Sequence, residues 1–195
     1  EEASAASDWF KRQGLNRLTK LRAAYLFCYN AAMTDIDFYI LSAQEPQQRL
    51  DFACRLVEKA YRSRCKVYIH LDNDAEAKAF DELLWNYREN SFIPHGLVGS
   101  DDLEENCPVY IGSGDQQAPH FDVLLNLATD IPATFARHKR LLEIVIQQDA
   151  VLAATRLHYK FYKERGYPIN NIDMRISDWF DTASDQLDNY STSRL

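Results

Sequence analysis

Several features that mark particular classes of protein are scarce or missing in this sequence of 195 residues. No apolar run approaches the roughly 20 residues that a helix needs to span a bilayer, so no membrane-spanning segment is expected. The four cysteines show no Cys-x-x-Cys spacing, the usual pattern of zinc and redox sites, which favours free thiols and a cytoplasmic location. Basic residues number 22 against 29 acidic ones, a balance that argues against broad binding to nucleic acid. Contact with DNA is therefore expected to be mainly indirect.

Patterns that carry catalysis or cofactor binding are also missing. The five histidines form neither a His-x-x-x-His nor a His-Glu-x-x-His pair, so no metal site is predicted. The sequence has no P-loop and no Gly-x-Ser-x-Gly elbow. Gly112 and Gly114 follow a strand-like run, but Gln116 and Pro119 come next, without a third glycine or a helix start. No catalytic residue or cofactor is predicted, and a nucleotide-binding enzyme that uses the edge near Gly112–Gly114 is the alternative function.

The composition provides enough apolar material for a core, because 46% of the residues are hydrophobic and 12% are aromatic. Three zones differ in pattern. Residues 33–175 have the character of one domain, preceded by an N-terminal extension of residues 1–32 and followed by an acidic C-terminal tail of residues 176–195. The chain is thus predicted to be one domain with two extensions.

The extensions allow more than one interpretation. The first is locally basic with apolar residues at helical spacing, which fits a partner-binding helix, a disordered arm, or sequence upstream of a start at Met33. The acidic tail carries the aromatic pair Trp179 and Phe180 and could fold back onto a basic surface. The tetrapeptide Ser-Asp-Trp-Phe occurs at residues 7–10 and again at residues 177–180, a match short enough to arise by chance.

Within the domain, strand-like runs alternate with helical ones. The strand-like or apolar runs lie at residues 37–41, 66–71, 108–111, 121–127 and 140–146, and the helical runs at about 46–61, 73–85 and 147–165. Pro46 suits a first helical turn, Asp72 or Asn73 can cap the second helix, and Gly166 is typical of a helix end. Residues 88–106 are interpreted as a polar loop. Strands joined by crossover helices predict an α/β fold with a three-layer, mostly parallel, Rossmann-like sheet and helices on both faces.

The last predicted helix has two stripes. The one expected to face the sheet carries Val151, Ala154, His158 and Phe161 or Tyr162. The neighbouring one carries Leu152, Arg156, Tyr159 and Lys163, with Lys160 beside it. A guanidinium can bind a carboxylate and a phenol ring can pack against an apolar side chain, so an acidic peptide with a hydrophobic end would suit both. The alternative is a solvated basic face near a helix C-terminus, where the helix dipole favours cations.

Five short segments carry a family resemblance. They are Asp-Phe-Tyr-Ile-Leu at 37–41, Leu-Leu-Trp at 83–85, Ser-Phe-Ile-Pro-His at 91–95, Tyr-Lys-Phe-Tyr at 159–162 and Gly-Tyr-Pro at 166–168. Together they resemble the chi subunit of bacterial DNA polymerase III, an accessory protein of the clamp-loader complex. The resemblance runs from about Asp35 to Asn171 and leaves out both extensions. It implies a non-catalytic adaptor in DNA replication.

The resemblance also implies partners. In that family one surface binds the psi subunit, which connects chi to the clamp loader, and another binds the acidic C-terminal tail of the single-stranded-DNA-binding protein, which ends in phenylalanine. Some chi-like proteins also serve a repair helicase. By resemblance, the residues of the tail-binding pocket are Trp85, Val145, Arg156 and Tyr159, with Lys160 and Lys163 nearby. Phe92 falls in the segment associated with psi binding.

Two questions stay open in the sequence. Leu152 stands where the family commonly has a lysine, so either the pocket is less basic or Lys139, Lys160 or Lys163 supplies the charge. Trp85 and Phe92 are either aromatic anchors at an interface or ordinary core residues.

Overall fold

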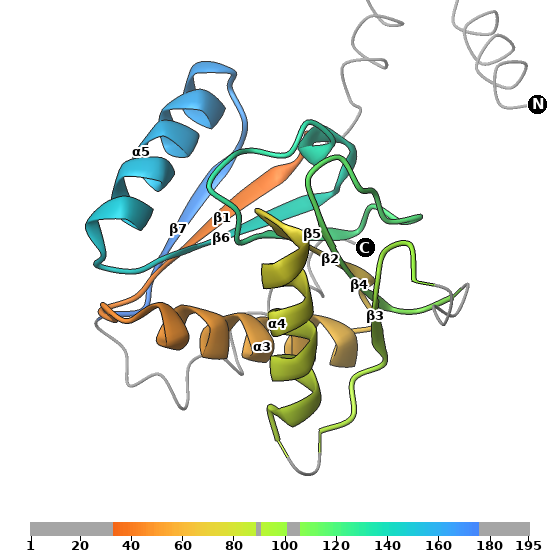
Figure 1. Cartoon of the computed structure of the whole chain (residues 1–195). Helices are drawn as coiled ribbons and strands as arrows, with labels where there is room; N and C mark the ends of the chain where they lie inside the picture. The colour runs from red at the N-terminus through yellow and green to blue at the C-terminus, as the bar shows by residue number, and fades with distance from the viewer. Residues whose placement is uncertain (1–32, 89–90, 101–105, 176–195) are drawn as a thin grey trace, which may run out of the picture. The chain divides into compact units, whose positions relative to one another are not determined.

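The computed structural model describes residues 33–88, 91–100 and 106–175, which form a parallel sheet with helices on both faces (Figure 1). The strands are β1 (Asp35–Ile40), β2 (Val67–Leu71), β3 (His95–Leu97), β4 (Val109–Ser113), β5 (Val123–Asn126), β6 (Arg140–Val145) and β7 (Ile169–Asp173). The helices are α3 (Pro46–Arg62), α4 (Asp74–Asn86) and α5 (Asp149–Glu164), with a short 3-10 turn, η1 (Phe135–Arg137). The predicted N-terminal helix and the acidic tail lie outside the described residues. Across the described ranges, no helix is both long enough and apolar enough to cross a membrane.

The strand order is β3-β4-β2-β5-β6-β1-β7, and every neighbouring pair is parallel. This confirms the predicted sheet. Two of the strands are not predicted by the sequence pattern. The three-residue β3 lies inside the segment interpreted as a polar loop, and β7 has the polar sequence Ile-Asn-Asn-Ile-Asp. Both are at the edges of the sheet, where a strand pairs on one side only and needs no continuous apolar run.

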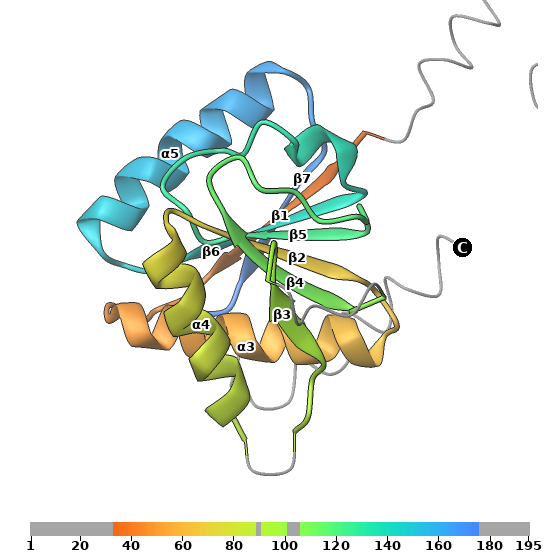
Figure 2. The same cartoon turned by 45° about the vertical axis from the view of Figure 1, so that its right-hand side comes forward.

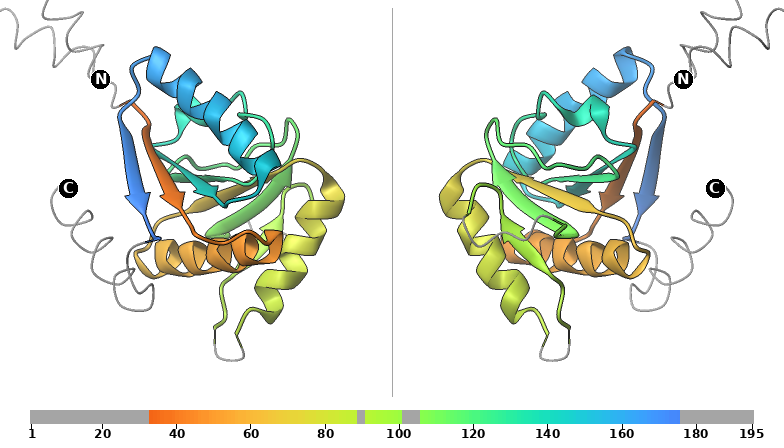
Figure 3. Two further views of the ribbon diagram at one scale, coloured as in Figure 1. Left: turned by 90° about the vertical axis from the view of Figure 1, so that its left-hand side faces the viewer. Right: turned by 90° about the vertical axis from the view of Figure 1, so that its right-hand side faces the viewer.

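The two faces of the sheet carry separate cores. Helices α3 and α4 cover one face and α5 covers the other, as the views in Figure 3 show. Side chains on β1 alternate accordingly: Ile36 and Phe38 belong to the core on the α5 side, and Tyr39 belongs to the core under α3 and α4. Because both faces are covered, the central strands are buried along most of their length.

The helix boundaries follow local signals in the sequence. Pro46 opens α3 next to a capping box formed by Glu45 and Gln48. Asn73, not Asp72, caps α4, because its side chain accepts a hydrogen bond from the Glu76 backbone at 3.0 Å. Just beyond α5, Gly166 has a φ of +76°, a left-handed conformation that glycine adopts without steric cost.

The face that α5 turns to the sheet differs in part from the prediction. His158 and Tyr162 are buried as expected, and Thr155 is the third buried residue of the helix. Phe161 is only half-buried, and its ring lies 5.8 Å from the Phe135 ring of η1. The η1 segment packs beside the helix, and this neighbour could not be read from the spacing of apolar residues.

Loops and η1, in place of a second helix, cover β2 and β4 on the α5 side (Figure 2). Three buried histidines lie there: His70, His120 and His138. Burial lowers the pKa of all three, and for His120 burial and the nearby Lys66 lower the pKa to about 4. Neither ring nitrogen of His120 has a hydrogen-bond partner among the described residues. The neutral form is therefore the one that fits the fold.

This burial predicts acid sensitivity. A histidine with a lowered folded-state pKa stabilises the fold above its unfolded pKa of about 6.5, and the contribution is lost as the pH falls toward the folded value. For His120 the loss between pH 7 and pH 5 should be on the order of 1–2 kcal/mol. His120→Phe keeps a ring against Tyr110, whose ring lies 5.1 Å away, and should flatten the acid side of the profile in urea unfolding at several pH values. Equal pH slopes for the two proteins would contradict the prediction.

Candidate partner-binding surfaces

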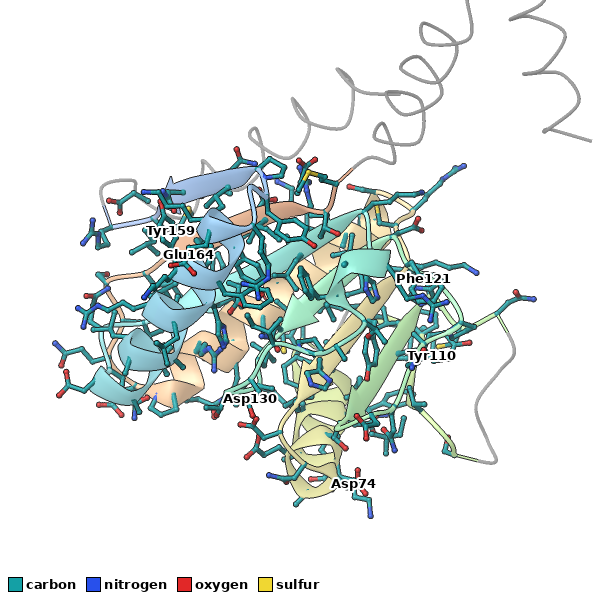
Figure 4. The ribbon with its side chains drawn as sticks, turned by 90° about the horizontal axis from the view of Figure 1, so that it is seen from above. Asp74, Tyr110, Phe121, Asp130, Tyr159 and Glu164 are labelled. Atoms are coloured by element: carbon teal, nitrogen blue, oxygen red, sulfur yellow. The ribbon has the colours of Figure 1, made fainter. Side chains whose placement is uncertain are left out.

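The side of α5 that carries Tyr159 lies toward β1 and β7 (Figure 4). Tyr159 is half-buried there, with its ring 5.5 Å from the Phe38 ring of β1. The Lys163 ammonium lies 5.7 Å from the centre of the Tyr159 ring. Arg156 is exposed and forms no hydrogen bond or ion pair with the described part of the chain. We call Leu152, Arg156, Tyr159 and Lys163 the cationic flank. The guanidinium of Arg156 is available to an external carboxylate.

Val145 and Leu152 form the apolar base of this flank. Val145, the last residue of β6, is 6% exposed and belongs to the same core cluster against which Leu152 and Tyr159 pack. Val145, Leu152 and Tyr159 thus belong to one core on the α5 side of the sheet, and Arg156 is an exposed residue of the same helix. Leu152 is half-buried in that cluster, so an apolar side chain suits its environment.

Three lysines could supply the positive charge that Leu152 lacks, and the structure gives each of them different neighbours. The Lys139 ammonium lies 2.7 Å from a carboxylate oxygen of Asp122. Lys160 lies 3.8 Å from Glu164, four residues along the same helix. Lys163, in contrast, has its ammonium over the Tyr159 ring and is on the same helix as Arg156.

Trp85 lies elsewhere. It is on α4, which packs on the face of the sheet opposite to α5 (Figure 3). Its ring centre is 5.7 Å from that of Phe92 and 4.8 Å from that of His95. Among the four pocket residues implied by the resemblance, Trp85 is the one on α4, and its ring contacts Phe92 and His95. We call Trp85, Phe92 and His95 the aromatic patch.

The aromatic patch is an exposed surface with a fixed base. Trp85 is 54% exposed and Phe92 is 68% exposed, whereas the next residue, Ile93, is buried. His95 is held by hydrogen-bond contact of Nδ1 with the Ile93 carbonyl at 2.7 Å. Between these groups is a pocket of about 370 Å³ lined by Leu84, Trp85, Asn86, Arg88, Ser91, Phe92, Ile93 and His95. Exposed neighbouring aromatic rings are typical of a protein interface, and core packing does not explain either ring.

The segment before Phe92 is tied to α3. Glu58 on α3 accepts a hydrogen bond from the Ser91 hydroxyl at 3.2 Å and forms ion pairs with Arg62 at 2.6 Å and Arg88 at 3.5 Å. These contacts help to hold Phe92 outward. The sequence pattern indicates no role for His95 or Glu58, because their contacts join segments that are distant along the chain.

A buried network holds α5 on the sheet. Glu143 of β6, only 1% exposed, accepts hydrogen bonds from Tyr162 at 3.2 Å and from Asn126 at 3.2 Å. His158 contributes a third contact, with Nδ1 at 3.0 Å from the same carboxylate. This network was not predicted from the sequence, although a glutamate between Leu142 and Ile144 in an apolar strand is a visible signal.

The partners of His158 determine its charge. Nδ1 faces the Glu143 carboxylate, and Nε2 lies 2.9 Å from the carbonyl oxygen of Thr129. Both neighbours are acceptors, so only the imidazolium form can donate to both. Burial lowers the pKa of His158, but the hydrogen bond and charge of Glu143 and the Thr129 carbonyl outweigh it, and the net pKa is raised. The network is therefore a buried ion pair with neutral donors around it.

The glycines of the candidate nucleotide edge have packing roles. A Cβ atom at Gly112 would lie 2.8 Å from the Tyr68 hydroxyl oxygen, and Gly114 has a φ of +55° in the turn after β4. The Gln116 side chain fills that turn, where its Oε1 accepts a hydrogen bond from the Ser113 backbone at 3.1 Å. The chain then continues to β5 without an intervening helix.

Acidic residues occupy the N-termini of α3, α4 and α5, where a bound phosphate would need positive potential. Glu45 caps α3, and Asp74 and Asp149 lie in the first turns of α4 and α5. Each carboxylate already interacts with the positive end of a helix dipole and would repel an anion. In the described ranges, no group of three or more His, Cys, Asp or Glu side chains is placed to hold a metal ion. This geometry lends the nucleotide-binding alternative no support.

Comparison with known families agrees with the segments quoted from the sequence. Residues 33–170 match the family described as DNA polymerase III chi subunit, HolC. The chain belongs to the chi subunit family. The DNA polymerase III subunit chi of Pseudomonas aeruginosa is 37% identical over 139 residues, which cover 71% of this chain and 96% of the relative. The chi subunit of Haemophilus influenzae is 30% identical over 134 residues, 68% of this chain and 92% of the relative.

A chi subunit from Escherichia coli is 25% identical over 143 residues, which cover 71% of this chain and 97% of the relative. Among solved structures, the crystal structure of T4 UvsW matches with a TM-score of 0.53 and 11% identity, over 74% of this chain and 42% of that chain. At that identity the likeness concerns the fold alone. The family resemblance and the α/β fold predicted from the sequence are both confirmed.

Proposed function

We propose that this chi family chain is a non-catalytic bridge within DNA polymerase III. The cationic flank binds the acidic C-terminal tail of the single-stranded-DNA-binding protein, and the aromatic patch binds the psi subunit of the clamp loader. The observation that carries the proposal is the position of Arg156, an exposed guanidinium without a partner in the described residues, beside the half-buried ring of Tyr159.

The flank suits a peptide that ends in an acidic and hydrophobic sequence. Arg156 can form a bidentate pair with a carboxylate, and Lys163 adds a second positive charge over Tyr159. The apolar base of Val145, Leu152 and Tyr159 can take a terminal aromatic side chain. A charge contact alone would be weak and salt-sensitive, so the adjoining apolar base is what adds selectivity.

A labelled peptide tests this part of the proposal. Fluorescence anisotropy with an acidic peptide that ends in Asp-Ile-Pro-Phe should show saturable binding to the full chain at low salt. Binding should weaken as salt is raised, because exposed charges are screened. The same peptide with its last residue changed to alanine is the control, and it should bind less tightly. Equal binding of both peptides would reject the apolar part of the site.

The aromatic patch supports the psi assignment through exposure and position. Phe92 and Trp85 present adjoining rings, and Trp85 is on α4, which covers the face opposite to α5, so a partner there leaves the cationic flank accessible. Anchors of this type often contribute most of the binding energy of an interface. We therefore assign Trp85 to the psi-binding patch, not to the tail-binding pocket that the resemblance implied.

Phe92→Ser is expected to weaken psi binding by about tenfold or more, because a buried aromatic anchor at an interface contributes about 2 kcal/mol or more. The free energy of unfolding should change by less than about 0.5 kcal/mol, since the ring is exposed. Titration calorimetry with purified psi subunit measures the first quantity. Leu157→Ser is the matched control, because Leu157 is 69% exposed but lies on α5. Equal losses for the two variants would contradict the assignment.

A further inference from the structure

The described chain ends four residues beyond the strand position that pairs with Phe38. Asn171 of β7 pairs with Phe38 of β1, and the Phe38 ring is the one that contacts Tyr159. Arg175 is four residues beyond Asn171, so about 13 Å of extended chain separates it from the level of Phe38. Residues 176–180 span up to roughly 17 Å when extended. The first five residues of the tail are thus long enough to return to Tyr159.

The composition of the tail complements that surface. Residues 176–195 contain four aspartates, at 178, 181, 185 and 188, and one basic residue, Arg194. Asp178 and Asp181 flank the aromatic pair Trp179 and Phe180. Carboxylates next to aromatic rings are what an exposed guanidinium beside an aromatic wall and an apolar base can bind.

We propose that residues 176–195 bind the cationic flank of the same chain and compete there with an acidic peptide from outside. The competition rests on the proposed function of the flank, whereas the contact itself does not. A tethered segment acts at an effective concentration in the millimolar range. Even a contact with an intrinsic Kd of about 0.1–0.5 mM would then reduce the affinity for an external peptide by about threefold to tenfold.

The test uses the full chain and the Asp-Ile-Pro-Phe peptide. Trp179→Ala with Phe180→Ala removes the aromatic pair and should tighten peptide binding by about threefold or more. The repeated tetrapeptide offers a matched control, since Trp9→Ala with Phe10→Ala makes the same change in the other Ser-Asp-Trp-Phe copy and should leave the affinity unchanged. The proposal is overturned if the Trp9→Ala, Phe10→Ala variant binds the peptide more tightly than the parent chain does, or if the Trp179→Ala, Phe180→Ala variant does not.

A direct readout separates this inference from the proposed function. A labelled synthetic peptide of residues 176–195 should bind the Trp179→Ala, Phe180→Ala chain and lose that binding when Arg156→Ala is added. No binding at 1 mM protein, on the order of the effective concentration, overturns the tail contact while external peptide binding can still stand. If the external peptide fails to bind and the tail peptide binds, only the proposed function fails. If the increase in peptide affinity caused by Trp179→Ala with Phe180→Ala grows with protein concentration, the tail binds a second copy of the chain. That result would also overturn the proposal.

Discussion

Replacing Glu143 with alanine is expected to lower the free energy of unfolding by about 3–5 kcal/mol, the usual cost of removing one partner from a buried ion pair. The carboxylate is 1% exposed and contacts His158, Tyr162 and Asn126. Without it, a buried imidazolium loses its counter-charge and two neutral donors lose their acceptor. Urea unfolding at pH 7, followed by far-UV circular dichroism, measures the change.

Two variants calibrate that result. Tyr162→Phe removes a single hydrogen bond to a charged group and should cost about 1.5–3 kcal/mol. Glu143→Gln keeps an acceptor without the charge, so its cost should fall below that of Glu143→Ala. If Glu143→Ala costs no more than Tyr162→Phe, the ion pair does not have the role assigned to it.

The loss of stability caused by Glu143→Ala should depend on pH in a definite direction. The pKa of His158 is raised in the folded protein, so the pair stabilises the fold below the unfolded pKa of about 6.5 and this stabilisation is lost as the pH rises through the folded value. The difference in stability between the parent chain and Glu143→Ala should therefore narrow on the alkaline side. The buried neutral histidines His70, His120 and His138 act in the opposite direction.

Arg156→Ala is expected to weaken binding of the Asp-Ile-Pro-Phe peptide by roughly tenfold or more, because a charge-assisted hydrogen bond contributes about 1.5–3 kcal/mol. The fold should be unaffected, since Arg156 is exposed and has no hydrogen bond or ion pair with the described residues. Anisotropy titrations give the affinity, and urea midpoints verify the stability. The loss should shrink as salt is raised, because both the contact and its long-range attraction are screened.

Arg165→Ala separates a specific contact from a general charge effect. Arg165 follows α5 directly and carries the same charge, but its guanidinium lies 3.6 Å from the centre of the Phe161 ring, on the other side of the helix. Its removal should change peptide affinity by less than about twofold, the scale of exposed long-range charge effects. Equal losses for Arg156→Ala and Arg165→Ala would show that only net charge matters and would remove the flank as a site.

Local features of the sequence were sufficient for the three α-helices and for five of the seven strands in the described part of the chain. Proline at the start of α3, asparagine before α4 and glycine after α5 act within one helical turn of their own positions. Helical spacing likewise predicts that Arg156, Tyr159 and Lys163 share one side of α5. Such predictions succeed because the responsible interactions join residues that are three or four apart.

Tertiary structure decided what depends on distant segments. β3 and β7 exist because the sheet offers them a partner strand on one side, although their sequences are short or polar. Trp85 was grouped with Arg156 by resemblance, but α4 and α5 cover opposite faces of the sheet, and its ring instead meets Phe92 and His95. Glu143 is accommodated only because β5 and α5 bring Asn126, His158 and Tyr162 to it.

The cations and aromatic rings that share one side of α5 can thus be identified from the sequence, because they are residues of a single helix at helical spacing. Whether each ring was core or surface, and whether each charge was paired, depended on which elements packed around it. Burial and pairing are properties of the assembled sheet, which joins segments more than a hundred residues apart in the sequence, and no local pattern encodes them.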